Sequence, residues 1–163
     1  MNRVCIVGVG SPSGDDQAGW LTVDALLDLG IRSGDGVVIE KLDRPGSALI
    51  PLLRSTAWLI VVDAMQGEGE AGQIQRFDET GWPHYGHGLS SHGLGVIDAL
   101  MLAGELGSLP PRLDLYGIEI AGTTPGSSPG RAIRAAATRL AAMISDQLAS
   151  GFSIPPGTQP GYG

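Results

Sequence analysis

The sequence predicts an α/β fold, a three-layer α/β/α sandwich around a five-stranded, mostly parallel, twisted sheet. Two observations lead to this prediction. Strand-like apolar runs alternate along the chain with segments whose apolar residues recur at helical spacing, which is typical of a parallel sheet covered by helices. Residues 57–64, AWLIVVDA, are dominated by a continuous apolar run, as expected for a strand buried on both faces.

The first half of the chain carries the clearest signals. After the first apolar run, Leu, Val and Ala recur at helical spacing until Gly30 ends the predicted helix. The next helix is short, and Pro51 weakens or kinks it. The predicted order is therefore strand, helix, strand, short helix and strand, at residues 3–9, 16–30, 36–42, 46–55 and 57–64.

One strand in the second half breaks the parallel pattern. Residues 72–78 alternate polar and apolar side chains and begin soon after the strand at 57–64. A parallel return needs a crossover of about a dozen residues or more, so we expect this strand to run antiparallel, at or near an edge of the sheet. Pro129 precedes the last helix, where proline is favoured. The remaining elements are a strand, a helix, a strand and a helix, at residues 72–78, 91–107, 112–120 and 130–150.

Length and composition indicate one globular domain. The chain has 163 residues, of which 42% are hydrophobic and 17% charged. We predict a single α/β domain over residues 1–150 and a flexible, Pro- and Gly-rich tail over residues 151–163. No apolar run approaches the ~18–20 residues of a membrane span, and the N-terminus shows no signal segment. The sequence therefore predicts a cytoplasmic protein with no membrane partner.

Charge and cysteine content exclude some functions. The formal net charge of −7 argues against nucleic acid as a partner, because phosphate binding needs a basic surface. It is compatible with a basic peptide or a metal centre, and solubility alone also explains it. Cys5, the single cysteine, lies inside an apolar strand pattern and is expected to be a buried, inert thiol.

Acidic residues follow the two strands that would flank the switch point of the sheet, where ligands bind in such folds. Asp15 and Asp16 follow the strand at 3–9, and Asp63 stands at the end of the strand at 57–64. One acid of the pair is expected to cap the next helix; we favour Asp15, with Asp16 facing the crevice. A carboxylate at Asp63 would be costly to bury unless it is paired or bound to a metal.

A histidine is the candidate third member of this site. His92 opens the helix that leads into the last strand, beside the same crevice, whereas His84 and His87 lie in the preceding loop. Asp16, Asp63 and His92 would supply two carboxylates and one imidazole, a donor set that suits a borderline divalent ion with open positions. The glycine spacing of the first turn does not match the dinucleotide fingerprint, and neither a Walker pattern nor a G-x-S-x-G elbow occurs.

Four stretches, in order along roughly residues 3–149, resemble the hydrogenase maturation endopeptidases: GVGSPSGDDQAGW, LIVVDAM, SSHGLGVIDAL and LYGIEI. The resemblance implies a peptidase that removes a C-terminal extension from the large-subunit precursor of a nickel–iron hydrogenase after nickel insertion. It implies that Asp16, Asp63 and His92 contact nickel supplied by the precursor, with no permanently bound cofactor. We expect the enzyme to act as a monomer.

Three questions stay open at this point. The nickel of the substrate could position a water or polarise the scissile carbonyl, with Asp16 or Asp63 as a catalytic base, or these residues could only recognise nickel. The chain could also be a nickel-sensing chaperone without peptidase activity. Asp43, after the second strand, could be functional or could cap the short helix that follows.

Overall fold

The computed structural model describes most of the chain, namely residues 3–11, 14–34, 36–43, 46–54, 56–66, 69–83, 91–120 and 129–152. The strands are β1 (Arg3–Gly10), β2 (Val37–Asp43), β3 (Thr56–Met65), β4 (Ile74–Phe77) and β5 (Arg112–Glu119). The helices are the 3-10 helices η1 (Gly14–Gln17) and η2 (Gly46–Leu53) and the α-helices α1 (Ala18–Asp28), α2 (Ser91–Glu105) and α3 (Arg131–Phe152).

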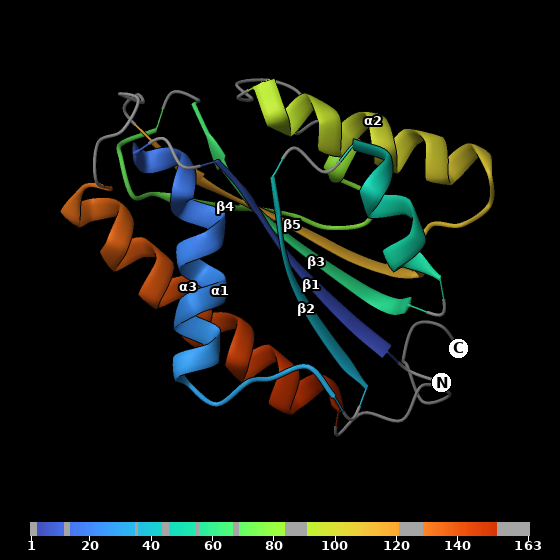
Figure 1. Cartoon of the computed structure of the whole chain (residues 1–163), viewed down its shortest axis with the longest axis horizontal. Coiled ribbons are helices and arrows are strands. Elements are labelled where there is room, and N and C mark those ends of the chain that lie inside the picture. The colour runs from blue at the N-terminus through green and yellow to red at the C-terminus, as the bar shows by residue number, and fades with distance from the viewer. Residues whose placement is uncertain are drawn as a thin grey trace.

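The strands form one five-stranded sheet in the order β2-β1-β3-β5-β4. Helices α1 and α3 cover one face and α2 and η2 cover the other (Figure 1). The predicted three-layer sandwich is therefore confirmed. The first and third strands are neighbours, so the switch point lies where the sequence places it.

The predicted antiparallel strand is also confirmed. Strands β1, β2, β3 and β5 pair in parallel, whereas β4 pairs with β5 antiparallel and lies at an edge. It is shorter than predicted, only Ile74–Phe77. The short connection from Met65 to Ile74 leaves no room for a crossover helix, which forces the reversal of direction.

The structure refines the prediction for two helices. The helix expected at 16–30 is preceded by η1 and begins only at Ala18, and Gly30 follows its end with a φ of 90°. The short helix predicted around Pro51 is present as a 3-10 helix. Proline lacks the N–H that a helix needs at that position, and its ring clashes with the preceding turn, which opposes a long α-helix there. Short helical segments are frequently of the 3-10 type.

The central strand β3 is buried on both faces, as its apolar run predicts. Trp58, Ile60 and Val62 belong to the apolar layer under α1 and α3. Leu59 and Val61 belong to the layer under α2 and η2. Alternate residues of a strand point to opposite faces, so a strand with a helix layer on each side needs apolar residues at every position.

A buried charge holds the short edge strand β4 to the sheet. Asp114 of β5 is fully buried and forms an ion pair of 2.6 Å with Arg76 of β4. Its other oxygen accepts a hydrogen bond of 2.8 Å from Trp58 Nε1. The Arg112 guanidinium lies 3.6 Å from the centre of the Trp58 ring. These contacts cluster near the beginnings of β3 and β5, since Asp114 lies opposite Ile60.

Cys5 provides a direct test of the β1 environment. Its side chain has no exposed surface, and burial, the largest effect, raises the pKa of the thiol to about 11. The thiolate is the reactive form of cysteine, so the native protein should resist iodoacetamide at pH 8 and become fully labelled in guanidinium chloride. Mass spectrometry checks both results. Rapid labelling of the native protein would contradict a buried, inert thiol.

No helix in the described ranges combines the length and apolar character that a membrane span needs. Helix α3 ends at Phe152, and residues 153–163 lie outside the described ranges. The division into a domain over 1–150 and a flexible tail over 151–163 therefore stays a prediction.

Candidate functional site

The carboxyl ends of the parallel strands gather several chain segments at one edge of the sheet. Helix η1 follows β1 there and contacts both β1 and β3. Helix α2 returns the chain to the beginning of β5, so the first residues of α2 lie toward this edge, as Figure 1 shows. The segments that carry the three predicted ligands therefore converge on the end of the sheet that binds ligands in related architectures.

Asp63 lies in β3, close to this edge, beside Gly117 of β5. Its side chain has no exposed surface. One carboxylate oxygen, Oδ1, accepts a hydrogen bond of 2.8 Å from the Ala64 N–H. Burial of a carboxylate is costly and needs compensating partners, so its place inside an otherwise apolar strand favours a function for the side chain.

Two glycines bring the Asp16 segment against the strand of Asp63. A Cβ on Gly19, in the first turn of α1, would lie only 2.3 Å from the Val9 carbonyl oxygen and 2.5 Å from the Val62 carbonyl oxygen. A Cβ on Gly8 would lie 2.4 Å from the Gly19 carbonyl oxygen. The main chain of α1 thus packs directly on β1 and β3, immediately before Asp63.

The structure describes the main chain, but not the side chains, of two predicted ligands. Asp16 is in η1, and His92 is the second residue of α2. His84 and His87 lie outside the described residues. Among the side chains that are described, no three His, Cys, Asp or Glu residues are arranged to hold a metal ion. The nickel-contacting set of Asp16, Asp63 and His92 stays a prediction.

The predicted role of Asp15 as a helix cap is wrong. The residue before α1 is Gln17, which makes no side-chain cap bond, because η1 intervenes between the strand and the α-helix. Asp15 Oδ1 instead accepts a hydrogen bond of 2.8 Å from the Gly130 N–H, just before the start of α3. A carboxylate is favourable at that position because it complements the helix dipole. Asp15 therefore ties η1 to α3.

A second carboxylate at this edge received no role from the sequence. Glu119 ends β5 beside Met65 of β3, and its side chain is 1% exposed. Its Oε2 accepts a hydrogen bond of 2.8 Å from Gln75 Nε2 of β4. The signal for Glu119 is an acidic residue near the end of an apolar strand, the same signal that identified Asp63. Asp43, exposed at the end of β2, keeps both of its alternatives open.

Comparison with known proteins gives a family. The model of the HycI family, described as hydrogenase maturation protease, matches residues 45–147, well over half of the chain. No curated protein matches the sequence.

Several solved structures share the fold. The hydrogenase maturating endopeptidase HybD from E. coli superimposes with a TM-score of 0.81 at 23% identity, covering 91% of this chain and 93% of that one. An endopeptidase from Escherichia coli solved in solution gives 0.82 at 22% identity, with 96% and 99% covered. The hydrogenase maturation protease HycI from Thermococcus kodakarensis KOD1 gives 0.72 at 24% identity, with 89% and 91% covered. The chain belongs to the hydrogenase maturation protease family, and as a maturation endopeptidase it is a peptide hydrolase.

Proposed function

We propose that this protease removes the C-terminal extension of the large-subunit precursor of a nickel–iron hydrogenase after nickel has been inserted. Asp16, Asp63 and His92 recognise the nickel that the precursor carries. The observation that carries the proposal is the fully buried carboxylate of Asp63 at the end of β3, beside the segments of the other two residues. Its partner is the precursor, and the enzyme acts as a cytoplasmic monomer.

The donor set explains why nickel would belong to the substrate. Two carboxylates and one imidazole leave positions of a divalent ion open, so the precursor's own ligands can complete the coordination. The protease would then sense whether the precursor is loaded before cleaving it. Elemental analysis of the purified enzyme should accordingly find no stoichiometric metal, and a tightly held metal would contradict nickel supplied by the substrate.

The roles of the carboxylates in the chemical step remain two alternatives. Asp16 or Asp63 can act as a general base toward a water that the precursor's nickel positions. They can instead hold the nickel while the precursor supplies the remaining groups. Under the first alternative, a variant without the charge still binds the loaded precursor. Under the second, it loses that binding.

A cleavage assay tests the proposal. Purified enzyme is incubated with nickel-loaded precursor and, separately, with the same precursor prepared without nickel. We expect a loss of mass at the C-terminus of the loaded precursor only. Equal cleavage of both forms would refute nickel recognition. Binding of the loaded precursor without any loss of mass would instead support the alternative of a nickel-sensing chaperone.

A further inference from the structure

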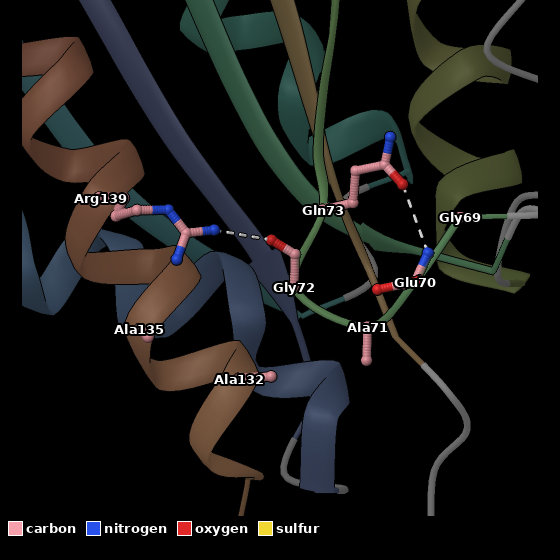
Figure 2. A pocket seen from close by; sticks show the side chains of 8 residues that line it. All are labelled: Gly69, Glu70, Ala71, Gly72, Gln73, Ala132, Ala135 and Arg139. Carbon is pink, nitrogen blue, oxygen red and sulfur yellow. Dashed lines mark hydrogen bonds between the residues drawn. The ribbon is translucent and has the colours of Figure 1, made fainter.

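A pocket opens between the β3–β4 turn and the N-terminal half of α3, with a volume of about 520 Å³ (Figure 2). Asp63, the predicted nickel-contacting residue whose side chain the structure describes, does not line it. Its lining comes from the turn on one side and from one face of α3 on the other: Gly69, Glu70, Ala71, Gly72, Gln73, Ala132, Ala135 and Arg139.

Small residues make the walls of this pocket. Gly72 adopts a positive φ of 93°, and a Cβ there would lie 3.0 Å from the Ala132 carbonyl oxygen. The turn therefore packs its main chain against α3. Ala135 lies one turn further along the helix, with an exposed side chain. Walls made of glycine and alanine let another main chain approach closely, as an extended peptide would.

Arg139 is the positively charged residue of the pocket lining. Arg139 Nη2 donates a hydrogen bond of 2.9 Å to the Gly72 carbonyl oxygen, as Figure 2 shows. A guanidinium has five N–H groups, so this bond uses only part of its capacity. Within the described part of the chain, no carboxylate forms an ion pair with Arg139. Glu70 is the acidic residue of the lining.

The N-terminal half of α3 is basic, although the chain as a whole carries a net charge of −7. Arg131 and Arg134 are exposed on the same half of α3 as Arg139. This half of the helix therefore favours a negatively charged ligand. Arginine is suited to carboxylates because its planar group can donate two parallel hydrogen bonds to them.

The pocket adjoins the edge of the sheet where Asp16, Asp63 and His92 are proposed to contact nickel. The Gly72 N–H donates a hydrogen bond of 2.8 Å to the Glu119 carbonyl oxygen at the end of β5. A Cβ on Gly69 would lie 3.1 Å from the Glu119 carboxyl carbon. The bond from Gly130 to Asp15 joins the start of α3 to η1. A peptide that starts at this edge of the sheet and runs along α3 would therefore reach Arg139.

We propose that this pocket binds a carboxylate of the C-terminal extension that the enzyme removes, with Arg139 as the recognising cation. The inference rests on the proposed function, because that function makes the substrate a peptide with a free C-terminus. The carboxylate is either the terminal group of the extension or the side chain of an acidic residue in it. Arg139 determines affinity for the extension and takes no part in the chemical step.

Matched arginine variants test the role of the charge. Arg139→Gln keeps an N–H donor for Gly72 but removes the charge, and should raise KM for nickel-loaded precursor about tenfold with little change in kcat. Arg139→Lys keeps a charge and should recover part of the affinity. Arg134→Gln is the control and should leave KM nearly unchanged. Arg134 is also exposed on α3 and also contacts a main-chain carbonyl, that of Pro129, but it does not line the pocket. Equal KM for Arg139→Gln and wild type would refute the proposal.

A second pair of variants tests whether the substrate occupies the pocket, without changing any charge. Ala135→Leu should fill the pocket and raise KM, whereas Ala142→Leu, exposed two turns further along the same helix, should not. Thermal melts of the two variants should agree, because both positions are exposed. A similar KM for both would show that the pocket does not hold the substrate.

Peptide binding separates this inference from the proposed function. The isolated extension, as a free acid, is titrated into isotope-labelled protein, and shifted amide signals at Gly72 and Ala135 are expected. If the same peptide with a C-terminal amide no longer binds, the pocket recognises the terminal carboxylate. If binding is lost when the Asp and Glu residues of the peptide are replaced by Asn and Gln, the pocket recognises an acidic side chain. No shift with any peptide would refute the pocket proposal. Failure of wild-type enzyme to cleave loaded precursor would refute the function instead.

Discussion

Asp63→Asn is expected to lower cleavage of nickel-loaded precursor by at least about 100-fold while the protein stays folded. The asparagine keeps the shape of the side chain and a carbonyl oxygen that can accept the hydrogen bond from Ala64. It removes the negative charge that would face a divalent ion. The loss of charge also removes repulsion from nearby carboxylates, which favours the folded state. Thermal melts and the cleavage assay measure the two effects separately.

Variants of the other proposed ligands should behave like Asp63→Asn. Asp16→Asn and His92→Ala are expected to stay folded and to fail in the same assay. His84→Ala and His87→Ala serve as controls and should retain at least partial cleavage. Neither histidine matches a metal-contacting residue of the family that the sequence resembles. Wild-type activity in Asp63→Asn would remove that residue from the site. Unfolding of Asp63→Asn would make its role structural.

Binding measurements with the same variant decide between catalysis and recognition. If Asp63 acts as a base, Asp63→Asn should bind nickel-loaded precursor as tightly as the wild type but leave it uncleaved. If Asp63 only recognises nickel, the variant should lose binding and discriminate less between loaded and nickel-free precursor. Pull-down of the loaded precursor by wild type and variant gives the comparison.

The sequence predicts the sheet well because its signals are local. The apolar run at 57–64 is long enough to show a strand buried on both faces, and the structure places β3 at the centre of the sheet. The short link before residues 72–78 predicts an antiparallel edge strand, because chain length alone limits the possible connections. The nearness of Asp63 to the Asp16 segment follows from the same topology.

Other features depend on contacts between distant residues and carry no local signal. Asp15 looks like a helix cap in sequence, yet its partner Gly130 is 115 residues away. A 3-10 turn precedes α1, and α1 packs closely on β1 and β3, and hydrophobic periodicity reports neither feature. The sequence also assigned no role to the pocket beside α3, because its lining of small residues becomes a pocket only when the turn meets the helix.

Gly19→Ala is expected to destabilise the fold by about 3 kcal/mol, because its methyl group has no space. The added Cβ would lie 2.3 Å from the Val9 carbonyl oxygen and 2.5 Å from the Val62 carbonyl oxygen. Both contacts are with main-chain atoms of central strands, so α1 must move outward. For a chain of this size the loss corresponds to a fall in Tm of roughly 6–12 °C. Because η1 precedes α1, the movement should also separate Asp16 from Asp63 and lower cleavage.

The matched control for this prediction is Gly104→Ala, in the exposed part of α2. A Cβ on Gly104 would meet only the Leu109 side chain, at 3.2 Å from Cδ1, and that side chain can shift. Gly104 lies in the last turn of α2, where replacement of glycine by alanine stabilises the helix by less than the about 1 kcal/mol of an interior position, so Tm should stay level or rise. If Gly19→Ala melts at the wild-type temperature and cleaves normally, the close contact of α1 with β1 and β3 is not what positions Asp16.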